Sequence, residues 1–172
     1  MPDHLPVTLL QQREIEAGVI APLFRAFAAE VGESRAREIL AGVVRDLARR
    51  AGCAAAESVG GNDMPHLRQA IERWRAGGAL ELTVLRDDPD ALEFDVTRCR
   101  YAEMYRRLGL EDLGPILSCG RDAAMIEGFN PGLSYCRTQT LMEGAAHCDF
   151  RYRVGPPPAD QSPPADTPGR EL

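Results

Sequence analysis

The sequence predicts an α+β domain in which N-terminal helices pack on one face of an antiparallel sheet of about four strands. Three observations predict this class. Apolar residues recur every three or four positions in the first part of the chain, and the period falls to two after residue 78. Two pairs of later segments are then joined by turn-forming residues.

The N-terminal part predicts three helices. Residues 8–30 carry apolar side chains at helical spacing, with an expected break or kink at Pro22 and a stop at Gly32. A second helix is expected from an N-cap at Ser34 to Gly52. A third is expected to start at residue 62 or 63 and to end at residues 77–78. The buried side of the second helix is expected to carry Ile39, Leu40, Val43, Val44 and Leu47.

The rest of the domain predicts two hairpins with helices between them. Residues 79–85 and 91–97 alternate between apolar and polar side chains around a turn rich in Asp, so they form one hairpin with a dry face. A helix at 100–108 and one or two more within 111–127 follow. The second hairpin is expected from residues 133–142 and 148–154.

One domain accounts for the chain. Residues 1–8 are expected to form a tail and residues 9–155 a single domain, whose part 94–152 carries the motifs. A chain of 172 residues buries roughly 70% of its unfolded surface and needs no disulfide or metal to fold. Proline is frequent in residues 156–172, which are expected to be a disordered tail.

Composition excludes several classes of function. All 20 basic residues are arginines, which excludes a Schiff-base lysine, a Walker lysine and a Ser-Lys dyad. The net charge of −6 argues against binding to nucleic acid. The start lacks the long apolar run of a signal peptide, and no stretch approaches the ~18–20 apolar residues of a membrane span. Five cysteines without a CxxC pair indicate reduced thiols and a cytoplasmic location.

The candidate chemistry gathers in residues 98–153. This segment has eight arginines against seven acidic residues, although the chain as a whole is acidic. Guanidinium groups bind carboxylates through two hydrogen bonds, so a pocket for a small anion is one interpretation. Ordinary surface ion pairs explain the same composition.

Cysteine and histidine supply the reactive candidates. If a helix starts after Gly120, its dipole lowers the pKa of Cys119 and makes that thiol a nucleophile. His147, at a hairpin turn, can act as an acid, a base or a ligand. A zinc site of Cys99, Cys119, His147 and Cys148 is disfavoured because no pair has the short spacing of structural sites, so no metal or other cofactor is expected. Neither a G-x-S-x-G motif nor a nucleotide-binding glycine loop is present.

Several motifs in order carry a resemblance to a known family: residues 96–105, 117–122, 127–131, 137–140 and 144–151. They resemble the L-2-amino-thiazoline-4-carboxylic acid hydrolase family over about residues 94–152. The last motif also looks like the Gly-x-x-x-Cys-x-Phe end of 4-vinyl-reductase-like ligand-binding domains, whose fold is α+β. The resemblance implies a cytoplasmic hydrolase that opens a small cyclic amidine-like ring bearing a carboxylate.

The resemblance also implies roles for motif residues. Ring opening needs attack on ring carbon C2, protonation of the leaving atom and stabilisation of charge. In one hypothesis Cys119 attacks as a thiolate and His147 moves protons. In a second, Cys119 or Asp149 only positions a water that attacks directly. Asp122 is a catalytic candidate that holds the amidinium, an alternative to Glu127.

The same hypothesis names the residues that bind the substrate. Its carboxylate is expected on Arg137 or Arg151, since both are arginines within the motifs. The other expected substrate-binding residues are Glu127, Asn130, Thr138 and Tyr101.

Two classes without chemistry compete with the hydrolase. A ligand-binding or sensor domain of the same fold holds a small molecule in the same cavity, and it predicts an ordinary thiol pKa near ~8.5 for Cys119. A scaffold protein exposes an apolar patch and has no pocket. The apolar N-terminal helices can cover the sheet or a second subunit, so a homo-oligomer is a possible partner besides the small anionic heterocyclic substrate.

Overall fold

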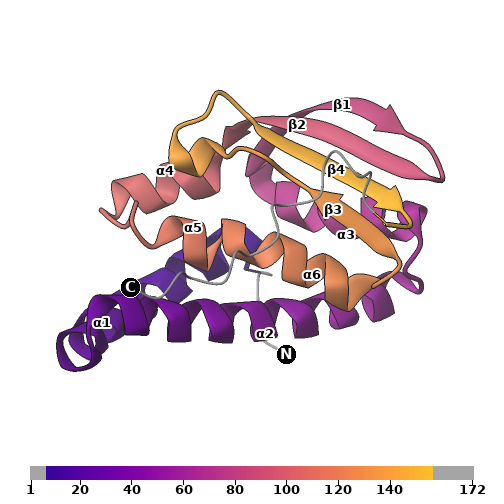
Figure 1. The fold of residues 1–172 in the computed structure, drawn as a ribbon. Coiled ribbons are helices and arrows are strands. Elements are labelled where there is room, and N and C mark those ends of the chain that lie inside the picture. The colour runs from indigo at the N-terminus through magenta and orange to yellow at the C-terminus, as the bar shows by residue number, and fades with distance from the viewer. Residues whose placement is uncertain (1–6, 157–172) are drawn as a thin grey trace, which may run out of the picture.

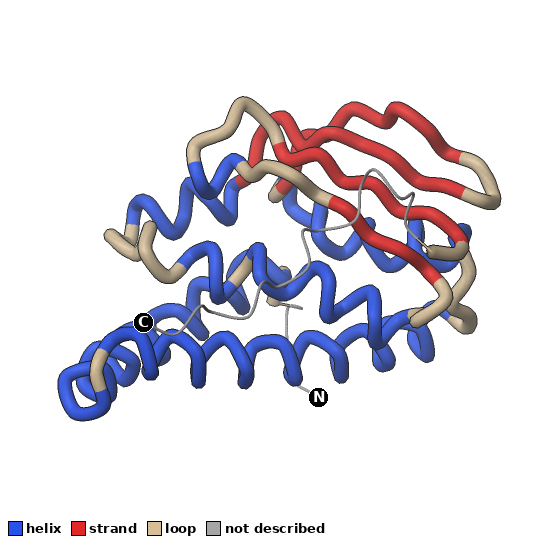
Figure 2. The backbone as a smooth tube through the Cα atoms, in the orientation of Figure 1, coloured by secondary structure: helices blue, strands red, loops and turns tan. Residues whose placement is uncertain are grey.

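The computed structural model of the protein describes residues 7–156 (Figure 1). It confirms the predicted α+β class: helices pack against a four-stranded antiparallel sheet with the strand order β1-β2-β4-β3 (Figure 2). The strands are β1 (Leu80–Asp87), β2 (Ala91–Cys99), β3 (Leu133–Cys136) and β4 (Cys148–Val154). The helices are α1 (Leu9–Val31), α2 (Glu33–Val59), α3 (Met64–Arg75), α4 (Arg100–Arg107), α5 (Gly114–Leu117) and α6 (Asp122–Phe129). The predictions for residues 1–6 and 157–172, which include most of both expected tails, lie outside the described residues.

Helix α1 begins and ends where the sequence predicts. Thr8 and Gln11 form a reciprocal capping box at its start, and Gly32, with φ +86°, ends it. Of the break or kink expected at Pro22, a break is excluded, because α1 continues through this residue. Pro22 and Gly18, whose carbonyl the proline deprives of a donor, are both exposed, so water can satisfy that carbonyl.

Helix α2 differs from the prediction at both ends. It starts at Glu33 rather than after a Ser34 cap, and it runs past Gly52 to Val59, where Gly60 ends it with φ +80°. Gly52 has a packing role instead. A Cβ at this position would collide with the backbone of Met125 and Phe129 in α6, so the glycine allows the two helices to approach closely.

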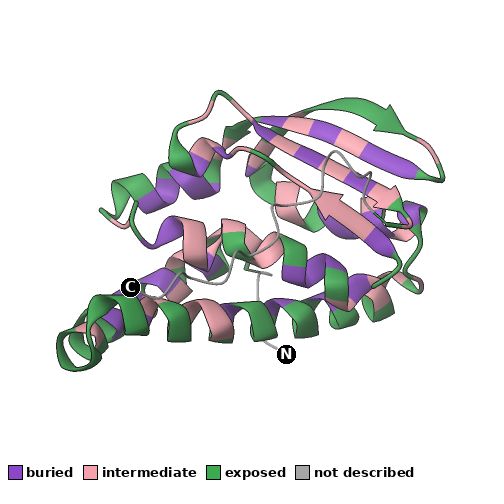
Figure 3. Cartoon of the chain, in the orientation of Figure 1, coloured by how far each residue is buried: buried purple, intermediate pink, exposed green. Residues whose placement is uncertain are grey.

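The predicted buried side of α2 was also wrong. Val44 is buried, but Ile39, Val43 and Leu47 are exposed. Figure 3 shows that much of the surface of α2 is exposed. Small residues take the buried positions instead: Ala36, Ala48, Gly52 and Ala55. Val43 and Leu47 line a cavity rather than the core, as described below.

The second hairpin is shorter than predicted. Strand β3 ends at Cys136, and residues 137–140 are not strand. The carboxylate of Asp149 accepts hydrogen bonds from the backbone N–H groups of Thr138 (3.0 Å) and Gln139 (2.9 Å), which are therefore not available for strand pairing.

The core consists of two clusters. One packs the inner face of the sheet against α2, α3 and α6, with Phe94 stacked on Phe150 at 5.0 Å between ring centroids. The other joins α1, α2, α4 and α5 around Phe24 and Tyr105. Members of both clusters line one cavity, which positions the candidate site between them.

Candidate functional site

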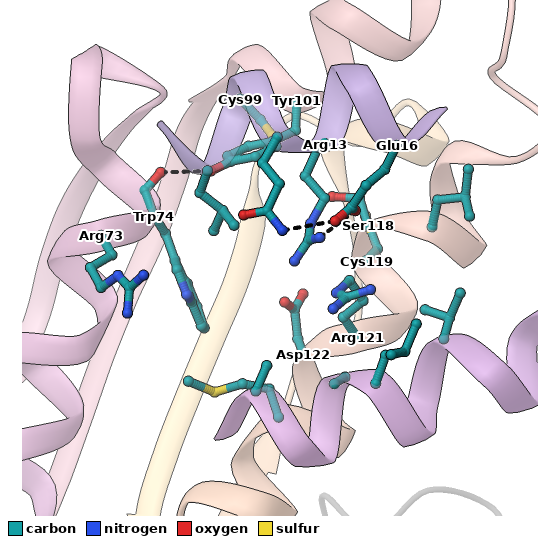
Figure 4. A pocket seen from close by; sticks show the side chains of 18 of the residues that line it. Arg13, Glu16, Arg73, Trp74, Cys99, Tyr101, Ser118, Cys119, Arg121 and Asp122 are labelled. Carbon is teal, nitrogen blue, oxygen red and sulfur yellow. Dashed lines mark hydrogen bonds and ion pairs between the residues drawn. The ribbon is translucent and has the colours of Figure 1, made fainter. Parts of the chain in front are cut away.

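A cavity of about 660 Å³ lies among α1, α2, α3, the inner face of the sheet and the start of α6 (Figure 4). Apolar side chains make up most of its wall. Two carboxylates also line it, from Glu16 and Asp122, and four arginines: Arg13, Arg73, Arg121 and Arg137. Two positive charges are thus unmatched by carboxylates of the wall, which favours an anionic ligand.

Asp122 and Arg137 form a largely buried ion pair. The Asp122 side chain is 19% exposed and that of Arg137 is 12% exposed. Arg137 also donates to the carbonyl oxygen of Cys119 at 3.2 Å, and its guanidinium lies 5.3 Å from the ring centroid of Phe150. Burial raises the pKa of Asp122 above its ordinary value, against the opposing charge of Arg137. This carboxylate is therefore suited to accept a proton.

Arg121 reaches the cavity without a protein partner. No hydrogen bond or ion pair to its guanidinium is formed within residues 7–156. Burial, and then the positive charge of Arg13, lower its pKa. An unpaired guanidinium in a mostly apolar cavity is a strong binding group for a carboxylate.

Helix α1 adds a second polar group to the wall. Nη1 of Arg13 lies 2.5 Å from Oε2 of Glu16, and Gln12 donates to Glu16 at 2.8 Å. In Figure 4 this pair, which comes from α1, lies above Arg121 and Asp122, which come from the start of α6. Arg13 is 9% exposed, although it is charged.

Three thiols from different elements line the cavity, those of Cys99, Cys119 and Cys148. The expectation of a lowered Cys119 pKa was wrong. Burial and then the charge of Asp122 raise the pKa of the Cys119 thiol well above its ordinary value. Burial likewise raises the pKa of Cys99 to about 11. These groups are neutral thiols at neutral pH.

Tyr101 is brought to the cavity as well. Its hydroxyl donates to the carbonyl oxygen of Trp74 at 3.1 Å, which ties α4 to the end of α3. Burial raises its pKa, so the phenol stays protonated.

Other predicted site residues lie on the outer face of the sheet, away from the cavity. Arg151 donates to Asp95 at 2.8 Å, across the strand pair. His147 has its Nε2 atom 2.7 Å from the amide nitrogen of Gln139 and 3.7 Å from Asp95. The hydroxyl of Thr138 donates to Asp149 at 2.7 Å. Successive residues of β4 alternate between faces, so Cys148 reaches the cavity while its neighbours do not.

Glu127 and Asn130 contact other parts of the protein rather than the cavity. Glu127 accepts a hydrogen bond from Arg49 of α2 at 2.8 Å on the surface. Asn130 donates to the carbonyl oxygen of Asn62 and accepts from the backbone of Gly132, both at 2.8 Å. Neither residue lines the cavity.

Residues 7–156 contain neither a group of metal ligands nor a membrane-spanning helix. No three His, Cys, Asp or Glu side chains in this part of the chain are grouped to hold a metal ion. His147, a member of the disfavoured zinc set, is not among the residues lining the cavity that its three cysteines share. No helix in the same range has the length and apolar character needed to cross a membrane.

Comparison with known families assigns the chain. The model of the L-2-amino-thiazoline-4-carboxylic acid hydrolase family matches residues 12–152. The chain belongs to this family. The match extends from α1 to β4, so it covers the N-terminal helices that line the cavity as well as the motif-bearing part.

Among solved structures, this hydrolase-family chain is similar to the phenol-responsive sensory domain of the transcription activator PoxR, solved with phenol. The TM-score is 0.50 at 14% sequence identity, and the match covers 78% of this chain and 72% of that one. This likeness shows a shared fold. A search of curated proteins found no match.

Sequence reasoning missed part of the cavity of this family member. Arg13, Glu16, Trp74 and Arg121 are not among the site residues that the sequence predicts. One signal was available: Arg13 stands in register with the buried residues Ala17 and Ala21, four and eight positions later. A charged residue on the buried stripe of an amphipathic helix indicates a polar cavity beneath it.

Proposed function

We propose that the protein is a hydrolase that opens a small carboxylate-bearing heterocycle, a cyclic amidine of the 2-amino-thiazoline-4-carboxylate type. One observation carries the proposal: an unpaired guanidinium, Arg121, and a buried carboxylate, Asp122, line the same cavity. A protonated cyclic amidine with a carboxylate has the complementary charges. Membership of the hydrolase family supports the same reaction class.

In this proposal Arg121 binds the carboxylate and Asp122 contacts the amidinium. The thiol of Cys119 adds to C2 while its proton passes to Asp122, because a neutral thiol needs a base. When the bond from C2 to the ring sulfur or nitrogen breaks, Asp122 returns the proton to the leaving atom. A water molecule then displaces Cys119 from C2, and the thiol regains a proton.

The position of Arg137 supports this role for Asp122. Its bond to the Cys119 carbonyl and its ion pair with Asp122 hold the two proposed reacting groups next to each other. A cytoplasmic location, where thiols stay reduced, fits the three separate thiols of the cavity.

The proposal is tested by incubating the pure protein with 2-amino-thiazoline-4-carboxylate and following the ring-opened product. We expect turnover, and we expect Arg121→Gln to raise KM about 10- to 100-fold, since it removes a charged hydrogen-bonding group. Arg151→Gln is the matched control on the outer face. An equal loss in both variants contradicts the assignment of the carboxylate to Arg121.

The attacking group is tested separately with Cys119→Ala. Loss of turnover with retained binding is expected if the thiol attacks C2. Turnover within a few-fold of the parent contradicts the nucleophile and assigns attack to water activated by Asp122.

The second candidate function is binding without reaction. The neutral state of Cys119 and the mostly apolar wall favour a domain that holds the same class of molecule as a signal. Saturable binding of the heterocycle that depends on Arg121, with no product after prolonged incubation, distinguishes this function from hydrolysis.

A further inference from the structure

The cavity is much larger than the ring that the proposed reaction needs. A ring acid of roughly nine non-hydrogen atoms, at no more than about 30 Å³ each, takes up less than half of the volume. The cavity holds about 660 Å³, which falls in the range of ~300–1,000 Å³ that suits ligands of drug size. A bare ring therefore leaves a large apolar part of the wall without contact.

Apart from the exposed Arg73 of α3, which lies beside Trp74, the charged groups of the cavity wall come from α1 and from the segment around α6. Figure 4 shows Cys119, Arg121 and Asp122 on one side and Trp74, from α3, on the other. Phe150 lies beside Trp74, with 6.4 Å between ring centroids. A ligand anchored on Arg121 thus has an apolar aromatic wall facing its other end.

Trp74 packs against the edge of the core and also faces the cavity. It is only partly buried, and it lines the cavity together with Ala70, one helical turn earlier. Within residues 7–156 its indole N–H has no acceptor. An aromatic ring that is half covered by protein and faces a cavity gains most by packing on an apolar group.

We propose that the substrate carries, besides its ring and carboxylate, an apolar substituent of about the size of a phenyl group that packs on Trp74. This inference rests on the function proposed above and narrows its substrate class. The ring and carboxylate occupy the end of the cavity at Arg121 and Asp122. The substituent occupies the side at Trp74.

The test compares two probes, 2-amino-thiazoline-4-carboxylate and its 5-benzyl derivative. Trp74 is the only tryptophan of the chain, so its fluorescence reports contact at that end of the cavity. We expect the benzyl derivative to bind about 10- to 100-fold more tightly, as burial of one large apolar group predicts, and to change the Trp74 emission. The bare ring is expected to leave the emission nearly unchanged.

A variant fills the Trp74 end of the cavity. Ala70→Leu is expected to reduce the preference for the benzyl derivative to less than about 3-fold, since the added side chain takes the space of the substituent. Ala29→Leu, at an exposed position of α1 outside the cavity, is the matched control and keeps the preference. The fluorescence titration of the unmodified protein tests the proposal even if Ala70→Leu does not fold.

Arg121→Gln separates this inference from the proposed function. If both probes bind equally and both lose affinity in Arg121→Gln, the proposed apolar substituent is contradicted, and the assignment of the carboxylate to Arg121 is retained. If neither probe binds, or if Arg121→Gln leaves the affinity of both probes unchanged, the proposed function and this inference are both contradicted. Tighter binding of the benzyl derivative with a change in Trp74 emission supports the inference.

Discussion

The two faces of the sheet use the same motif differently. On the inner face, Cys148 and Phe150 of β4 line the cavity. On the outer face, Asp149 binds the backbone of residues 138–139 and Arg151 pairs with Asp95. Neighbours in sequence are thus separated by the thickness of the sheet, because strand residues alternate between faces.

The residues of a family motif therefore have different roles on the two faces of the sheet. The charged and polar side chains of the outer face form ion pairs and hydrogen bonds with other protein groups, so these motif residues stabilise the structure around the site. On the inner side, Arg121 is without a protein partner in the described chain, and burial raises the pKa of Asp122. Groups that are unpaired or perturbed in this way are better candidates for ligand contact.

The largest expected effect compares one aspartate from each side. Asp122→Asn should lower kcat/KM about 10²- to 10⁴-fold, because it removes the proposed proton acceptor. Asp149→Asn should lower it less than about 10-fold. Steady-state kinetics of ring opening measure both, and similar losses in the two variants would break the distinction between the faces.

The pH profile of the unmodified protein depends on the same aspartate of the inner side, Asp122. Asp122 must be charged to accept a proton, so activity falls as the pH drops through its pKa. Because burial raises that pKa, the acidic limb of kcat/KM should lie above the ordinary aspartate value near ~3.9.

A smaller effect on stability compares two arginines. Arg137→Met leaves Asp122 as an uncompensated buried charge and should lower the free energy of unfolding by about 3–5 kcal/mol. Arg151→Met removes an ion pair whose two side chains are 22% and 23% exposed, against 12% and 19% for Arg137 and Asp122, and should cost about 1–2 kcal/mol. Urea denaturation monitored by circular dichroism measures the two values, and a reversed order would contradict the burial argument.

The smallest expected effect concerns acid stability through Asp149. Burial opposes its charge, but the hydrogen bonds from Thr138 and Gln139 outweigh it and lower the pKa of Asp149. Since the pKa is lower in the folded chain, the stabilisation is complete above the unfolded value near ~3.9 and is lost as the pH falls through the folded value. Asp149→Asn should therefore cost about 1 kcal/mol at pH 7 and progressively less below pH ~4. If the difference in unfolding free energy between the parent and Asp149→Asn does not change with pH, the hydrogen bonds to the charged Asp149 carboxylate do not stabilise the fold in this way.

Local signals predicted the elements of the fold better than their packing. Thr8 and Gly32 bound α1 as expected, because capping depends on residues adjacent in sequence. Gly52 was mistaken for a helix end, since its role depends on α6, which lies more than 60 residues later. The length of β3 was mispredicted for the same reason. The backbone N–H groups of Thr138 and Gln139 donate to Asp149, which lies about ten residues later in the sequence.

The site was predictable where it coincided with the motifs. Cys119, Asp122, Arg137 and Tyr101 do line one cavity. Val43 and Leu47 were placed in the core because periodicity identifies an apolar face without showing whether protein or a cavity covers it. The contribution of α1 to the cavity could not be predicted for a related reason: only the tertiary fold brings Arg13 and Arg121 to the same cavity.

The crossing of α2 and α6 makes the site dependent on two positions that never touch a ligand. Gly52 faces the backbone of α6, and Gly128 faces the backbone of Arg49 in α2, so the helices meet with no side chain between them. Helix α6 begins at Asp122, and α2 forms part of the cavity wall. Even a methyl group at either glycine would push the two helices apart and carry Asp122 with them. Substitutions at Gly52 and Gly128 are thus limited by the position of Asp122. A substitution at either glycine would reduce activity as an active-site mutation does, although neither glycine lines the cavity.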